Sequence, residues 1–203
     1  GHSIPMTSGI AYFEITIHKS PSNHVDAHFS PCVSIGLANH MHRLNKMPGW
    51  DNYSCGFHGD DGLYFMGCEY DGMSVTRDDR DAMFGEGDVV GLGVVYPNIC
   101  GGQQTLKFLT INGKHVSSVA DYYRNFDKCT WFPCVGTDCH CPIEMNFGNK
   151  GVPFMFDVVV FEKKLLRRRR RYLRRRKAAH KKIRGPRVKV GNDGLLRNKK
   201  FPE

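Results

Sequence analysis

The segment Leu106-Lys107-Phe108-Leu109-Thr110-Ile111-Asn112-Gly113 predicts a β-strand that ends in a tight turn. Residues 106–111 have the length and the apolar content of a strand. The Asn112-Gly113 pair that follows is the strongest short hairpin signal in a sequence, because a type I′ turn needs positive φ at both central positions. We therefore expect an antiparallel hairpin centred on this pair.

Working outward from the hairpin, the flanking sequence also reads as strands. Residues 11–17 alternate, with Tyr12, Glu14 and Thr16 on one face and three apolar side chains on the other. Residues 88–96 form a continuous apolar run that suits the interior of a sandwich. Further strands are predicted in residues 33–38, 56–66 (two short strands around the turn 58–62), 131–135, 143–147 and 158–161.

No sustained helical period occurs before Glu162, and turn signals recur between the short strands. This pattern is typical of an all-β sandwich or barrel. The charge pattern changes at the same point. Residues 1–161 carry a net charge of −7 and residues 162–203 a net charge of +16. We therefore predict one globular domain, residues 1–161, followed by a basic tail, residues 162–203, that is disordered or helical.

Several classes of protein are excluded by composition. The longest apolar run near the tail, residues 158–161, is far shorter than the roughly 18 residues that a membrane span needs. The chain begins with Gly1 and shows no leader pattern, so we expect a fragment or a processed product. Its eight cysteines are scattered, which favours free thiols in a reducing compartment, the nucleus or the cytoplasm; secretion stays an alternative if a leader lies upstream.

Seven segments in one order resemble the SPRY domain family over about residues 9–156. They are Tyr12-Phe13-Glu14-Ile15-Thr16-Ile17, Val33-Ser34-Ile35-Gly36-Leu37-Ala38, Pro48-Gly49-Trp50 with Gly56-Phe57-His58-Gly59-Asp60-Asp61-Gly62, Gly87-Asp88-Val89-Val90-Gly91-Leu92-Gly93-Val94, Phe108-Leu109-Thr110-Ile111-Asn112-Gly113-Lys114, Phe132-Pro133-Cys134-Val135-Gly136 and Met145-Asn146-Phe147-Gly148. The His-Gly-Asp-Asp-Gly run is most similar to the Ran-binding-protein-M branch.

The resemblance implies a bent sandwich of two antiparallel sheets whose end loops bind a peptide or a protein surface. Family members act as scaffolds or substrate receptors in ubiquitin-ligase assemblies, as chromatin-complex subunits or as secreted parasite effectors. The resemblance thus implies a non-enzymatic adaptor. Large aromatic and His side chains near predicted turns are the candidate partner contacts, since such groups are enriched in binding hot spots. These candidates are His40, His42, Trp50, Tyr53 and Tyr64, and for Trp50 inward packing that pins the loop is an equal alternative.

The sequence contains no convincing catalytic constellation. Gly91-Leu92-Gly93 begins like a dinucleotide fingerprint, but Tyr96 stands where the third glycine belongs, so glycines in a packed strand are favoured. Cys55 and His58 would diverge on an extended strand, which disfavours a nucleophile and base. We therefore predict no enzyme activity and no cofactor.

Metal binding and carboxylate chemistry are also disfavoured. Cys129, Cys134, Cys139, His140 and Cys141 form one cluster of metal-ligand residue types, but Cys134 falls inside a predicted strand and the remaining group is cramped. Buried thiols are favoured there, with a disulfide as the alternative, and no metal site is predicted. Asp60 and Asp61 are expected to accept backbone hydrogen bonds in a turn. Asp78, Asp79 and Asp81 are expected to lie on a solvated loop.

The tail carries the densest charge in the chain, with eight arginines in the ten positions 167–176. Runs of this kind are the usual cue for nuclear import, and they also attract RNA or DNA without sequence preference. We predict an import receptor as the tail's partner, and polyanion binding as the alternative. The predicted contact residues are Arg167, Arg168, Arg169, Arg170, Arg171, Arg174, Arg175, Arg176, Lys177, Lys181 and Lys182.

Overall fold

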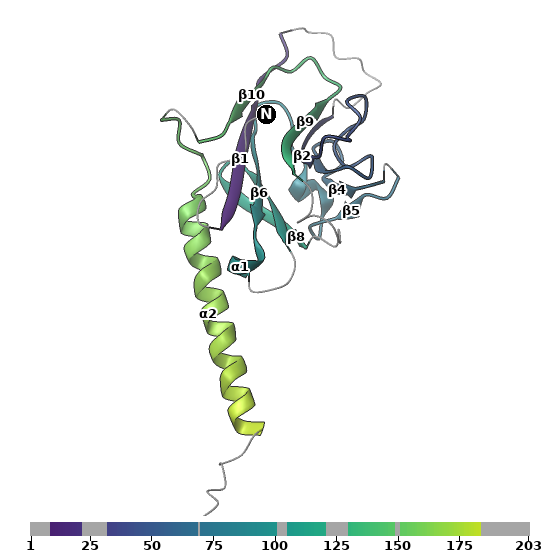
Figure 1. The fold of residues 1–203 in the computed structure, drawn as a ribbon. Helices are drawn as coiled ribbons and strands as arrows, with labels where there is room; N and C mark the ends of the chain where they lie inside the picture. Colours follow the sequence, from purple (N-terminus) through teal and green to yellow (C-terminus); the bar gives the residue numbers. More distant parts are fainter. Residues whose placement is uncertain are drawn as a thin grey trace, which may run out of the picture. The chain divides into compact units, whose positions relative to one another are not determined.

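The computed structural model describes residues 9–21, 32–68, 70–100, 105–120, 130–148 and 151–183. Within these residues the chain forms two five-stranded antiparallel sheets and a long C-terminal helix (Figure 1). The first sheet has the strand order β10-β1-β6-β7-β8 and the second β5-β4-β3-β2-β9. The strands are β1 (Ile10–Ile17), β2 (Val33–Ala38), β3 (Ser54–His58), β4 (Leu63–Met66), β5 (Met73–Ser74), β6 (Val89–Val95), β7 (Leu106–Ile111), β8 (Lys114–Ala120), β9 (Phe132–Thr137) and β10 (Ile143–Asn146).

The two sheets pack face to face around the main core, which confirms the predicted sandwich. The first sheet contributes inward side chains such as Phe13, Ile15 and Leu92, and the second contributes Ile35 and Phe57, all at most 1% exposed. The β7–β8 hairpin turns at the predicted pair, where Asn112 has φ 50° and Gly113 has φ 72°. The local signals thus placed the strands close to where they lie.

The outer face of the first sheet is buried as well, by the segment that follows β10. Tyr12 and Phe108 pack there against Phe154, Phe156 and Phe161. Glu14, 3% exposed, accepts hydrogen bonds from the Met155 and Phe156 N–H groups, each at 2.9 Å. Gly91 and Gly93 leave room on this face, because a Cβ at either position would overlap the Tyr12 or Phe108 ring.

The prediction of a strand at residues 158–161 is wrong. These residues begin α2 (Val158–Ile183), and in the described part of the chain two short helices, η1 (Asp79–Ala82) and α1 (Pro97–Cys100), also precede Glu162. Asp157 caps α2, because its carboxylate accepts the Val160 N–H at 2.8 Å. Val158 then packs into the aromatic cluster on the first sheet. A short apolar run does not distinguish a strand from a capped helix, and the cap decides here.

The chain divides into two compact units, residues 1–166 and 167–203. The predicted domain boundary, between residues 161 and 162, falls within α2, so the first turns of that helix belong to the first unit. Among the described residues, every helix is too short or too polar to cross a membrane.

Candidate functional site

A loop formed by residues 39–53, called here the anchored loop, lies directly on the outer face of the second sheet. Three glycines on neighbouring strands make this possible. Gly36 on β2 pairs with Gly56 on β3, and Gly136 lies on β9 on the other side of β2. A Cβ on Gly56 would stand 2.7 Å from the Pro48 carbonyl oxygen, and one on Gly36 would stand 2.6 Å from the Pro48 Cβ. Because these three glycines have no side chains, Pro48 can lie directly against the backbone of the strands.

Hydrogen bonds fix this contact point. His58 Nε2 donates to the Pro48 carbonyl at 2.9 Å, and the Gly49 N–H donates to Ser54 Oγ at 2.8 Å. The Gly49 carbonyl accepts the Cys68 N–H at 3.1 Å, which ties the next loop to the first. Gly49 has φ +100°, a region that other residues avoid. Hydrogen bonds from β3 and from Cys68 thus hold the backbone of the loop at Pro48 and Gly49.

Asp51 organises the remainder of the anchored loop. Its Oδ2 accepts from His42 Nδ1 at 2.9 Å and from the Arg43 N–H at 3.0 Å. Its Oδ1 accepts from the Tyr53 N–H and from Ser54 Oγ, both at 3.0 Å. Burial alone would raise the pKa of Asp51, but these hydrogen bonds outweigh burial and hold it below the usual value. One ionised carboxylate therefore closes the loop.

The rigid loop presents large apolar side chains to solvent. Leu44 is 97% exposed and Met41 53%, and Tyr53 is 36% exposed. Tyr70, on the loop tied through Cys68, is 89% exposed. Exposed apolar groups on an ordered frame suit recognition of another protein. Sequence reasoning missed Met41, Leu44 and Tyr70, although apolar residues within a turn-rich stretch were a usable signal.

The five predicted partner contacts have different environments. The His40 side chain is exposed, and Tyr53 is 36% exposed. The His42 side chain is only 4% exposed and serves to hold Asp51. Trp50 is half-buried and packs on His58, with ring centroids 5.6 Å apart, which matches the inward alternative. Tyr64, at 1% exposure, lies in the core against Phe57, so its prediction as a contact is wrong.

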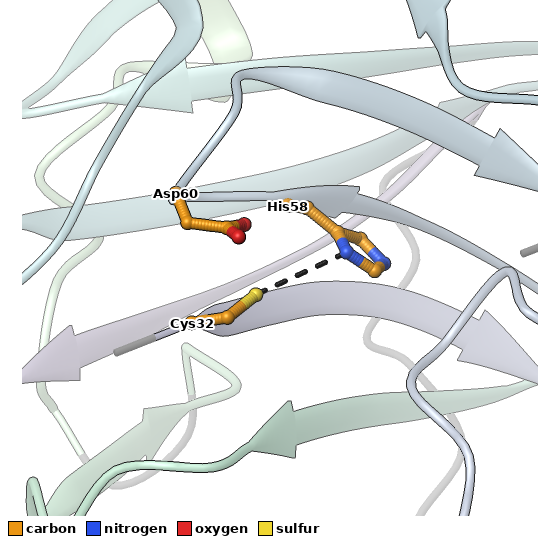
Figure 2. Close-up of side chains that lie close together, drawn as sticks. All are labelled: Cys32, His58 and Asp60. Carbon is orange, nitrogen blue, oxygen red and sulfur yellow. Dashed lines mark hydrogen bonds between the residues drawn. The ribbon is translucent and has the colours of Figure 1, made fainter. Parts of the chain in front are cut away.

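A cysteine, a histidine and an aspartate meet where the anchored loop is held. Figure 2 shows Cys32, before β2, His58, at the end of β3, and Asp60, in the following turn. Cys32 Sγ lies 3.9 Å from His58 Nδ1, and the ligand atoms of all three residues lie within 4.8 Å of one another. Burial raises the pKa of Cys32 and lowers that of His58, so both are neutral. A neutral buried thiol is a poor nucleophile.

Of the other predicted groups, Cys55 and His58 lie apart, whereas the Cys139 and Cys141 side chains interact. Cys55 faces the main core from β3 and so diverges from His58, as the alternation predicted. Cys139 contacts Thr137, and Cys141 donates to Glu86 Oε1 at 3.4 Å. Burial raises the pKa of the Cys134 thiol to about 11. Cys129 lies outside the described residues, and the described cysteines of this cluster, Cys134, Cys139 and Cys141, are free thiols.

The acidic pairs have local roles. Asp61 Oδ1 accepts the Leu63 N–H at 2.8 Å, which is the predicted turn geometry. Asp78 caps η1 by accepting the Arg80 N–H at 3.1 Å, and Asp79 accepts from Ser74 Oγ at 3.2 Å. These carboxylates are engaged with neighbouring backbone and side chains rather than facing one another across a cleft.

The basic clusters of the tail lie on α2. Residues 167–177 are exposed except for Arg169, which is half-buried, and Lys181 and Lys182 fall in the last turn, where the structure describes only the backbone. The tail is therefore helical as far as Ile183, one of the two predicted states. An import receptor that reads an extended chain would have to unwind this helix.

Comparisons with known proteins agree on the fold and the family. Residues 10–150 match the model of the SPRY domain. The chain is 34% identical over 160 residues to Ran-binding protein 9 of Xenopus laevis and 35% identical over 161 residues to Ran-binding protein 10 of Danio rerio, in each case over 77% of this chain. It spans 24% and 22% of those proteins, about a quarter of their length. A crystal structure of a human SPRY domain matches with a TM-score of 0.52 at 24% identity, covering 74% of this chain and 84% of that one.

Proposed function

Since the chain belongs to the SPRY domain family of protein-interaction modules, we propose that it binds a partner protein through the anchored loop and the adjoining loop of Tyr70. The observation that carries the proposal is the exposure of Leu44 and Met41 on a loop whose backbone is fixed by Asp51 and His58. A fixed loop loses little conformational entropy on binding, so its exposed apolar area is available for affinity.

The charge of residues 1–161 narrows the class of partner. These residues carry a net charge of −7, although the whole chain carries +9, so the domain taken by itself favours a basic partner over an acidic one. We infer a partner segment with apolar side chains for Leu44 and Met41 and with neutral or basic flanks. Ran is one candidate to test, because the similar Ran-binding proteins carry it in their names.

A role as a scaffold or substrate receptor in a ubiquitin-ligase assembly is the cellular form of this function that we propose. The family resemblance supports it, and the proposal requires that a second protein bind elsewhere on the chain. Association of the chain with ubiquitin-ligase subunits in cells, retained when the anchored loop is altered, is the expected result. Loss of all partners together would contradict a scaffold with separate sites.

The experiment for the anchored loop compares two substitutions at exposed apolar positions. Leu44→Asp places a charge at the centre of the proposed contact, and Val152→Asp places the same charge at a position 55% exposed outside both loops. Proximity labelling in cells identifies partners whose signal falls with Leu44→Asp, and titration calorimetry with those partners gives the affinity. We expect a loss of at least about tenfold for Leu44→Asp and none for Val152→Asp. Equal affinities for the two variants would contradict the proposal.

For the tail we propose nuclear import, with binding to RNA or DNA as the alternative. The density of arginines on exposed turns of α2 supports either partner. A large fluorescent fusion should be nuclear with the native tail and cytoplasmic when arginines 167–171 and 174–176 are changed to alanine. A variant with the same arginines changed to lysine is the matched control and should stay nuclear. Equal distribution of the native and alanine versions would refute import.

The nucleic-acid alternative has its own signature. Binding through phosphate contacts weakens steeply with salt, because each neutralised phosphate releases counterions. If the tail binds duplex DNA or RNA, the logarithm of its association constant should fall linearly with the logarithm of the salt concentration. The alanine variant should not show this dependence on salt. Retained import together with salt-insensitive binding would eliminate this alternative.

A further inference from the structure

The group of Cys32, His58 and Asp60 supplies one sulfur, one nitrogen and one oxygen ligand in a single place (Figure 2). Two of the three residues are fixed by regular structure, since Cys32 directly precedes β2 and His58 ends β3, and Ser34 pairs with His58 in the ladder. Cys32 and His58 are 5% and 2% exposed, whereas Asp60 is exposed on the turn. The group is therefore a buried pair with an exposed third member that opens to solvent.

His58 is oriented as a metal ligand. The Pro48 carbonyl can only accept a hydrogen bond, so the 2.9 Å contact with Nε2 places the ring proton on that nitrogen. Nδ1 then carries the free lone pair and faces Cys32 Sγ. Metal-ligating histidines commonly donate their other N–H to a backbone carbonyl, which fixes the tautomer and the ring plane. This outer contact is already present in the fold.

From this geometry we propose that Cys32, His58 and Asp60 bind a zinc ion. A tetrahedral zinc with the usual bond lengths to sulfur and nitrogen places those two atoms about 3.5 Å apart. The observed separation of 3.9 Å is slightly wider, and a shift of a few tenths of an ångström closes it. The Asp60 carboxylate already lies within 4.8 Å of the other two ligand atoms, and solvent supplies the fourth ligand.

The ligand set and the surrounding charge both favour zinc over harder cations. Thiolate and imidazole select zinc, whereas calcium and magnesium take oxygen ligands. Asp61 and Asp138 add negative charge nearby, and the Cys32 N–H is held by Asp138 Oδ1 at 2.6 Å. Binding breaks the Cys32 S–H bond, forms the zinc–sulfur bond and releases one proton to the buffer for each ion. No electron is transferred.

The test uses the full chain, stripped with a chelator under reducing conditions and titrated with Co²⁺ as a spectroscopic probe. We expect one equivalent of Co²⁺ with a thiolate charge-transfer band in the near ultraviolet, and displacement of that band by Zn²⁺. Cys32→Ala should abolish the band. Asp60→Asn should weaken binding at least about tenfold, as loss of even an outer contact does.

Two matched controls separate ligation from other effects. Asp61→Asn removes the same charge from the same turn and keeps the hydrogen bond to Leu63, so it should weaken binding much less than Asp60→Asn. The double substitution of Cys139 and Cys141 by alanine should leave the band unchanged. Circular dichroism confirms that each variant is folded. A band that survives Cys32→Ala, vanishes with the double substitution or is missing from the folded native chain would overturn the proposal.

Discussion

Replacing Asp51 by asparagine tests whether one carboxylate holds the anchored loop. The substitution keeps Oδ1, which accepts from the Tyr53 N–H and Ser54 Oγ, and replaces Oδ2, which accepts from His42 and the Arg43 N–H. The amide nitrogen of the asparagine cannot accept a hydrogen bond from the Arg43 N–H. Its own N–H groups would instead point toward that donor. The Asp51 side chain is only 14% exposed, so water replaces the lost contacts poorly. We expect a loss of about 1–3 kcal/mol in the free energy of unfolding.

The dependence on pH gives the sharper measurement. The pKa of Asp51 is lower in the folded chain than in the unfolded one, so the ionised carboxylate contributes stability above the unfolded value of about 4. That contribution is lost as the pH falls through the folded pKa. The gap between the native chain and Asp51→Asn in urea titrations should therefore be constant from about pH 5 to 8 and shrink below about pH 4.

Asp71→Asn is the matched control, because Asp71 is exposed and loses the same charge. Its stability should follow the native chain at every pH. A gap for Asp51→Asn below about 0.5 kcal/mol at neutral pH, the size of an ordinary surface change, would refute the reasoning. A gap of the same size at pH 3 and at pH 7 would show that shape and not charge holds the loop.

Three further substitutions test the frame around the loop. Gly113→Val should destabilise by about 1–3 kcal/mol, since a β-branched residue avoids the φ of 72° found there; Gly85→Val, with open space around it, should not, and equal melting temperatures would contradict the turn. Gly56→Ala should cost about 1–3 kcal/mol in urea, because the added Cβ meets the Pro48 carbonyl oxygen, and no loss would mean that the loop does not rest on β3 at Gly56. Glu14→Gln should cost about 1–3 kcal/mol and speed hydrogen exchange at Met155 or Phe156, since one acceptor becomes a donor; unchanged exchange would remove Glu14 from that role.

The strands could be predicted from the sequence because their signals are local. Alternation in residues 11–17 and the Asn112-Gly113 pair depend on neighbours a few positions away, and both lie where expected. The burial of Glu14 could not be predicted, since it depends on a segment about 140 residues later that covers the outer face of β1. The alternation placed Glu14 on the right face but gave no means to know that this face is covered.

The candidate site was only partly predictable for the same reason. The aromatic and histidine content of residues 40–53 directed attention to the loop that we propose as the contact surface, yet His42 and Trp50, which mark the loop, also hold it in place. The most exposed apolar side chains of the loop itself, Leu44 and Met41, are not aromatic, and composition does not single them out. The approach of Cys32 to His58 depends on the β2–β3 register, in which Ser34 faces His58, and a register between strands cannot be read from either strand alone.

His58 links the two proposals and also separates them. Its Nε2 holds the Pro48 carbonyl whether Nδ1 faces a thiol or a zinc ion, so zinc should stiffen the base of the anchored loop without reshaping it. The exposed contacts Leu44 and Met41 lie on the part of the loop that Asp51 closes, not His58. Removal of zinc should therefore lower the stability of the chain more than its affinity for a partner. Leu44→Asp should lower the affinity for a partner more than the stability of the chain. A variant in which stability and affinity changed together would place the metal within the binding surface itself.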